Sequence, residues 1–171
     1  VVLLDEAYND YIPPAERTDT TAWLAEFPNL VITRTFSKIY GLAGLRIGYA
    51  LASAEIADLM NRVRQPFNCN NLALAAATAA LDDHEFVARS YALNRSGMEQ
   101  IVAGIKRFGF THIPSHGNFV AFKAGDAPTL NQKLLKQGVI VRPIGGYGMP
   151  EWLRVTIGTE IENLRFLEAL E

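Results

Sequence analysis

Short apolar runs alternate with segments of helical periodicity along this chain, and this alternation constrains its fold more than any other feature. Residues 1–4 form a continuous apolar run, as expected of a strand that is covered on both faces. A β-branched run follows at residues 30–35, and another apolar run at residues 47–51. This order is typical of an α/β layer architecture with a mostly parallel sheet.

Helix signals and a change of rhythm divide the chain. Gly109 suits the left-handed position after a long helix at residues 84–108, and Thr159 and Glu162 match a capping box. Strands are expected at residues 118–123, 139–142 and 152–158, and helices at residues 21–27, 53–64, 71–81, 84–108, 128–137 and from 159 onward. We therefore predict two domains, a large-domain portion with an interdomain helix over residues 1–97 and a smaller α+β domain over residues 98–171.

Charge and cysteine content exclude several classes of function. Lys and Arg number 16 against 18 Asp and Glu, so nothing favours general binding to nucleic acid or to an anionic membrane. The longest nearly apolar run, residues 72–81, is far shorter than the roughly 18 residues that span a bilayer. Cys69 is the only cysteine, so neither an intrachain disulfide nor a zinc cluster is expected. A cytoplasmic protein with a small-molecule partner, or a second copy as partner, fits best.

Polar residues follow two of the predicted strands. The segment Asp5-Glu6-Ala7-Tyr8 comes after the first strand, and Thr35-Phe36-Ser37-Lys38 comes at the end of the second. In an open α/β sheet, ligands bind outside the carboxyl ends of the strands. One acidic residue or one lysine is more often merely solvated, but Lys38 stands among apolar residues, and Arg46 with nearby hydroxyls is a common way to hold a phosphate.

Other motifs are weaker. The glycine spacing after Lys38 matches neither a dinucleotide-binding fingerprint nor a P-loop. Arg142 and Arg154 interrupt strand-like apolar runs; a solvent-facing side chain is favoured for Arg142 and is an even alternative for Arg154. Asn118 is a candidate site residue that could equally just begin a strand.

Three segments together resemble the fold-type I pyridoxal-phosphate aminotransferases of classes I and II. These are residues 5–8, residues 35–49, in which Arg46 stands eight positions after Lys38, and residues 152–159. The similarity in order and spacing extends over essentially the whole chain. The stretch 139–158 looks most like the histidinol-phosphate branch, which transfers an amino group between histidinol phosphate and 2-oxoglutarate in histidine biosynthesis.

The resemblance implies roles around pyridoxal 5'-phosphate. Lys38 would attach the cofactor and then move a proton at the substrate Cα. Asp5 would pair with the pyridine nitrogen and Tyr8 with the phenolic oxygen. The cofactor phosphate would be held by Thr35, Ser37 and Arg46.

The resemblance also implies substrate contacts. Arg154 would hold the substrate carboxylate or an equivalent anion in a two-pronged pair. Arg142 would hold a second anion, the phosphate of histidinol phosphate, and Asn118 matches a family asparagine near the site. No metal is implied.

The family's large domain begins well before Asp5, so we expect this chain to be the C-terminal half of such an enzyme. The earlier half supplies a glycine-containing phosphate loop, an aromatic ring on the cofactor and an asparagine, and a partner subunit of a homodimer completes the site. We expect the chain alone to bind cofactor poorly, to be inactive, and to associate through an exposed sheet edge.

Alternative functions share the cofactor residues. Within the family these are an aromatic amino-acid aminotransferase and a threonine-phosphate decarboxylase. From another class, the chain would be a non-catalytic cofactor-fold domain used for binding. The intact set of an amine, a carboxylate and a phenol argues against the last alternative.

Overall fold

The chain divides into two compact units. The computed structural model describes residues 1–171, with one unit over Val1–Ser90 and the other over Tyr91–Glu171. The division falls inside helix α3 (His84–Arg107). The long helix is thus present as predicted. The domain boundary after residue 97 stays a prediction.

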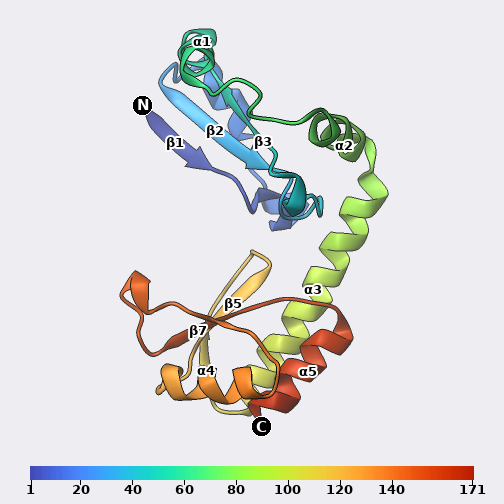
Figure 1. Cartoon of the computed structure of the whole chain (residues 1–171), viewed down its shortest axis with the longest axis vertical. Coiled ribbons are helices and arrows are strands. Elements are labelled where there is room, and N and C mark those ends of the chain that lie inside the picture. The colour runs from blue at the N-terminus through green and yellow to red at the C-terminus, as the bar shows by residue number, and fades with distance from the viewer. The chain divides into compact units, whose positions relative to one another are not determined.

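The first unit contains a three-stranded sheet, seen in the upper part of Figure 1. The strands β1 (Val2–Asp5), β2 (Leu30–Thr35) and β3 (Gly48–Ala52) lie side by side in sequence order. β1 runs parallel to β2, but β3 runs antiparallel to it. Within this chain the sheet is therefore mixed. The connection from β2 to β3, residues 36–47, contains one 3-10 turn and no α-helix, and it returns the chain antiparallel to β2.

Local capping determines where the helices of this unit begin. Helix α1 (Ala54–Val63) starts after Ser53, whose hydroxyl accepts a hydrogen bond from the Ile56 amide. Helix α2 (Asn71–Asp82) starts after Asn70 in the same way. The short helix expected at residues 21–27 is a 3-10 helix at Thr20–Ala25, and further single 3-10 turns occur at Asn9–Tyr11, Pro14–Glu16 and Ala43–Leu45.

β1 is not covered on both faces, contrary to the expectation from its sequence. Val2 is 56% exposed and Leu3 is 65% exposed. No strand pairs with the other edge of β1. By contrast, Ile32 on β2 is fully buried, because β2 is the central strand.

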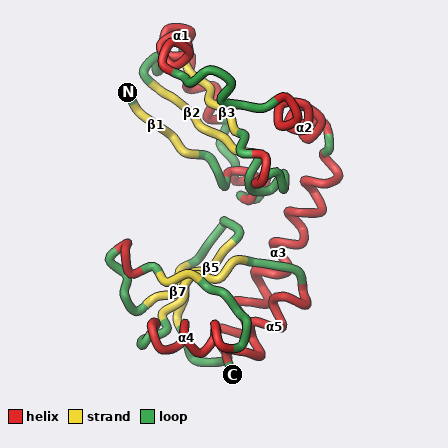
Figure 2. Tube along the Cα trace, in the orientation of Figure 1, coloured by secondary structure: helices red, strands yellow, loops and turns green.

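The second unit has an antiparallel sheet, drawn in yellow in the lower part of Figure 2. Its strand order is β4-β5-β7-β6. The bounds are β4 (Thr111–Ile113), β5 (Phe119–Lys123), β6 (Arg142–Pro143) and β7 (Trp152–Thr156). The strand expected at residues 139–142 is mostly absent, since regular pairing begins only at Arg142, and β4 was not predicted at all.

Helices α4 (Ala127–Lys136) and α5 (Glu160–Leu170) complete the second unit. The predicted capping box is present, because the Thr159 hydroxyl and the Glu162 carboxylate bond each other's backbone amides. Side chains from α3, the sheet and both helices form one continuous core, which includes Ile101, Val120, Phe122, Leu134, Leu153 and Phe166. No helix of the chain is long and apolar enough to span a bilayer.

Candidate active site

The first group of predicted site residues gathers at the carboxyl ends of β1 and β2. Asp5 ends β1, and its register partner on β2 is Thr33. Because the two strands are parallel, the residues that follow them emerge at the same edge of the sheet. The Asp5 carboxylate accepts a hydrogen bond of 3.0 Å from the Ala7 amide, so the chain turns immediately after the strand.

Lys38 and Tyr8 meet at this edge. The Lys38 Nζ lies 5.2 Å from the centre of the Tyr8 ring, within the range of a cation–π contact. Tyr8 precedes the 3-10 turn at Asn9–Tyr11, and Lys38 follows the end of β2. The structure thus brings together an amine and a phenol that are 30 positions apart in the sequence.

Thr35, Ser37 and Arg46 surround the turn that follows β2. The Thr35 hydroxyl accepts a hydrogen bond of 3.1 Å from the Ser37 amide. Arg46 has a left-handed backbone, with φ of 53°, and its guanidinium donates to the Ala43 carbonyl at 2.8 Å. A left-handed arginine is uncommon and marks a locally constrained turn. The guanidinium is exposed, and it makes no hydrogen bond to the hydroxyls of Thr35 or Ser37.

The second group of predicted site residues lies in the second unit, where two arginines face each other. Arg142 on β6 and Arg154 on β7 are direct register partners. Like charges directly opposite in an antiparallel pair are destabilising, and neither guanidinium is paired with a carboxylate. The Nε of Arg154 is buried without a hydrogen-bond partner. A buried cationic donor in this state is suited to an anion from outside the chain.

Two aromatic residues that the sequence analysis missed accompany this pair. The Arg154 guanidinium lies 4.6 Å from the centre of the Phe119 ring, and Arg142 donates a hydrogen bond of 3.3 Å to the Tyr147 hydroxyl. Since Ala121 is the partner of Arg154 on β5, Phe119 is its diagonal neighbour on the same face. Side chains two positions apart on a strand lie on the same face, and this periodicity of β5 is the signal that could have identified Phe119.

Asn118 stands directly before β5. Its carbonyl accepts a hydrogen bond of 2.8 Å from the Ile157 amide, which extends the pairing of β5 with β7 by one bond. The backbone of Asn118 therefore helps to begin strand β5, which was the structural alternative to a site role. Its side chain is half-exposed.

Glu6 forms a buried network beside the first group, which the sequence analysis also missed. Its carboxylate accepts hydrogen bonds from Arg34 Nε at 2.8 Å and from the Thr20 hydroxyl at 2.5 Å. Burial disfavours the charge on Arg34, but hydrogen bonds and electrostatic attraction, first from Glu6 and then from Tyr49, outweigh this, so the pKa of Arg34 is raised.

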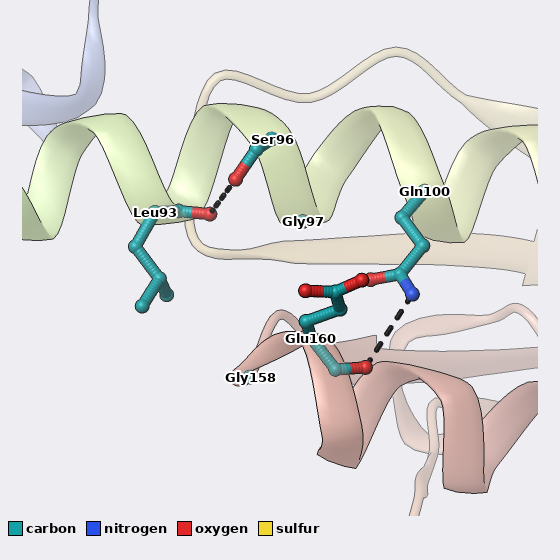
Figure 3. A pocket seen from close by; sticks show the side chains of 6 residues that line it. All are labelled: Leu93, Ser96, Gly97, Gln100, Gly158 and Glu160. Carbon is teal, nitrogen blue, oxygen red and sulfur yellow. Dashed lines mark hydrogen bonds between the residues drawn. The ribbon is translucent and has the colours of Figure 1, made fainter.

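A cavity of about 520 Å³ lies in the second unit between α3 and the start of α5 (Figure 3). Gln100 donates a hydrogen bond of 3.4 Å to the Glu160 carbonyl across it. The other lining residues are Leu93, Ser96, Gly97 and Gly158. None of the predicted site residues lines this cavity, and no cluster of His, Cys, Asp or Glu in the chain could hold a metal ion.

Known proteins resemble this chain over its whole length. The family model for aminotransferase class I and II matches residues 1–170. The histidinol-phosphate aminotransferase 1 of Dechloromonas aromatica is 80% identical, with 100% of this chain and 47% of that protein covered. The histidinol-phosphate aminotransferase 2 of Nitrosospira multiformis is 61% identical, with 99% of this chain and 44% of that protein covered. The chain spans about half the length of these curated relatives.

Among solved structures, the histidinol-phosphate aminotransferase of Sinorhizobium meliloti in complex with pyridoxal-5'-phosphate superposes with a TM-score of 0.91. Its sequence identity is 30%, and the match covers 99% of this chain and 47% of that chain. The likeness confirms the predicted fold class, an α/β sheet portion followed by a smaller α+β unit.

Proposed function

The chain belongs to the family of class I and II aminotransferases. We propose that it is part of a transaminase that moves an amino group between histidinol phosphate and 2-oxoglutarate. The observation that carries this proposal is the Lys38 amine 5.2 Å from the Tyr8 ring, at the sheet edge where Asp5 ends β1. The relatives at 80% and 61% identity, both histidinol-phosphate aminotransferases, favour this substrate over aromatic amino acids or threonine phosphate.

The residues of the first unit fit pyridoxal 5'-phosphate by their chemistry. An amine can bind the aldehyde, a carboxylate can bind the protonated ring nitrogen, and a phenol can bond the phenolic oxygen. These groups are Lys38, Asp5 and Tyr8. Hydroxyls and a guanidinium suit the phosphate, and Thr35, Ser37 and Arg46 carry them around one turn. The structural relative in complex with pyridoxal-5'-phosphate supports this choice of cofactor.

Bound pyridoxal phosphate supplies an electron sink that stabilises negative charge at the substrate Cα. Lys38 would hold the cofactor through its amine, and the same amine would move the proton at the substrate Cα. Asp5 keeps the proton on the ring nitrogen, because its carboxylate favours the cationic form. The Tyr8 hydroxyl orients the phenolic oxygen by a hydrogen bond.

The arginine pair would recognise the substrates' anionic groups. Histidinol phosphate carries a phosphate, and 2-oxoglutarate carries two carboxylates, so both can use a paired cationic site. Arg154 would grip one anion, because its buried Nε has no partner in the chain. Arg142 would contact a second, and Asn118 would lie beside the substrate. The neutralised charge would relieve the repulsion between the two facing guanidiniums.

We further propose a homodimer in the cytoplasm that takes part in histidine biosynthesis. The names of the two relatives described above support the pathway. The chain spans about half their length, so the remaining half of the site would come from sequence outside these residues and from a partner subunit.

Covalent labelling tests the proposal. The protein, purified from its own source at its full encoded length, is reduced with borohydride in the presence of pyridoxal phosphate and mapped by peptide mass. We expect a pyridoxyl adduct on Lys38, and Lys38→Ala should lower the transamination rate about 10²- to 10⁴-fold. Lys106→Ala, on an exposed part of α3, is the matched control and should keep full activity.

Substrate choice separates the alternatives. We expect turnover with histidinol phosphate and 2-oxoglutarate, at a rate well above that with phenylalanine or tyrosine, and no carbon dioxide release from threonine phosphate. An unlabelled Lys38 in an otherwise intact protein would support the non-catalytic binding domain instead.

A further inference from the structure

Glu6 is a buried carboxylate that the proposed chemistry does not use. It is 8% exposed, and both of its oxygens are engaged, one by Arg34 at 2.8 Å and the other by Thr20 at 2.5 Å. Its backbone is held as well, since its amide donates to the Thr33 carbonyl at 2.9 Å. A buried charge that is paired and hydrogen-bonded in this way is costly to disturb, because loss of a partner leaves an uncompensated charge.

Glu6 and its two side-chain partners come from three separate segments. Glu6 follows the last residue of β1, Thr20 begins the 3-10 helix at Thr20–Ala25, and Arg34 lies near the end of β2. Between β1 and Thr20 the chain has only isolated 3-10 turns with few backbone hydrogen bonds. Side-chain contacts therefore hold this segment in place. Glu6 therefore ties this connecting segment to the central strand.

The residues on either side of Glu6 belong to the candidate site. Asp5 directly precedes it, and Tyr8 stands two positions later in the same turn. Arg34 is followed by Thr35, which begins the turn that carries Lys38. A change at Glu6 would shift Asp5 and Tyr8 on one side of the site relative to Lys38 on the other.

We infer that Glu6 is a positioning residue, which sets Asp5 and Tyr8 against Lys38 through its bonds to Arg34 and Thr20. This inference rests on the proposed transaminase function. Misplacement of a reacting group by about 1 Å can cost about 100-fold in rate, so the effect of Glu6 should be seen in the chemistry and not only in stability.

The test compares Glu6→Ala, Glu6→Gln and Glu16→Ala in the full-length protein. Readouts are kcat, KM, cofactor dissociation and the pH midpoint of the bound cofactor's absorbance. We expect Glu6→Ala to lower kcat about 10- to 100-fold and to shift the absorbance midpoint. Glu6→Gln should recover most of the activity, because its amide can accept from Arg34 and donate to Thr20. Glu16, exposed in the same connecting segment, is the control and should change nothing.

The outcomes are distinct. Should Glu6→Ala fail to fold, Thr20→Val removes one hydrogen bond while the ion pair remains, and a shifted midpoint is still expected. An active wild-type protein with kcat and midpoint unchanged in the folded variants would overturn the positioning role alone, even if the melting temperature fell. A wild-type protein that neither binds pyridoxal phosphate nor transaminates would overturn the proposed function, and the positioning role with it.

Discussion

Replacement of Gly97 by alanine should destabilise the second unit, because this glycine is a point of close approach between α3 and the start of α5. A methyl group there would lie 2.6 Å from Ile157 Cγ2 and 2.7 Å from Asn163 Nδ2, and 3.3 Å from the Gly158 carbonyl oxygen. Favourable contacts between carbon atoms are about 3.5–4.0 Å. The neighbours would therefore have to move by about 1 Å.

These neighbours are poorly able to move. Ile157 is buried and β-branched, so its χ1 is restricted. Asn163, which is 2% exposed, bonds both backbone groups of Gly158, accepting from its amide at 2.9 Å and donating to its carbonyl at 3.2 Å. Gly97 and Gly158 also line the cavity shown in Figure 3, with Glu160 on the adjoining turn of α5.

The magnitude follows from three contributions. Overpacking of a close-packed site costs about 1–3 kcal/mol, and loss of one hydrogen bond of Asn163 costs about 1 kcal/mol. Replacing a glycine by alanine within a helix stabilises by about 1 kcal/mol, which cancels the second contribution. We expect Gly97→Ala to lower the free energy of unfolding by about 1–3 kcal/mol.

Gly104 provides a matched control on the same helix. The three atoms nearest to a methyl group there would all belong to the side chain of Leu167, with Cδ2 at 2.3 Å and Cδ1 at 2.7 Å. Leu167 is half-buried and can rotate at a cost of about 0.5–1.5 kcal/mol. The helix gain of about 1 kcal/mol offsets this, so Gly104→Ala should be close to neutral.

Urea unfolding followed by tryptophan fluorescence measures both effects. A Trp23→Phe background leaves Trp152, in the second unit, as the only tryptophan. If Gly97→Ala were as stable as the parent, or if Gly104→Ala lost as much stability, the reasoning from close approach would be refuted.

Three further predictions concern stability and titration. Burial, then the nearby charges of Tyr8 and Asp10, raise the pKa of Tyr11 to about 12, so ultraviolet titration should show a tyrosine that ionises near pH 12, and Tyr11→Phe should remove this step. Hydrogen bonds from Thr159 lower the pKa of Glu162. Its stabilisation is therefore present above the unfolded pKa of about 4 and is lost as the pH falls through the folded pKa. The acid side of a melting-temperature profile should be flatter in Glu162→Gln. Finally, Phe122→Ala should cost about 3–5 kcal/mol in urea unfolding, because its fully buried ring packs against Phe110 and Phe166.

Local features were predictable from the sequence. Ser53, Thr159 and Glu162 cap helices in the way their positions predicted, because a cap bonds backbone groups only two or three residues away. The strand runs at residues 1–4 and 30–35 and the long helix to Gly109 were also identified, since apolar periodicity and glycine conformation are properties of neighbouring residues.

Features that depend on pairing were not predictable. The antiparallel direction of β3, the strand β4, and the exposure of Val2 and Leu3 all depend on which segments lie beside each strand. A short strand carries little pattern of its own, so a single sequence does not identify its neighbours.

For the candidate site, too, residue types were predictable from the sequence and distances between residues were not. The sequence by itself determined which residue types could carry the chemistry, since Lys38, Asp5 and Tyr8 follow strands in a recognisable order. Only the tertiary structure placed Lys38 beside Tyr8 and set Arg154 opposite Arg142. It also revealed the network of Glu6, because distances between residues far apart in the chain are determined by sheet register and burial rather than by the order of the amino acids.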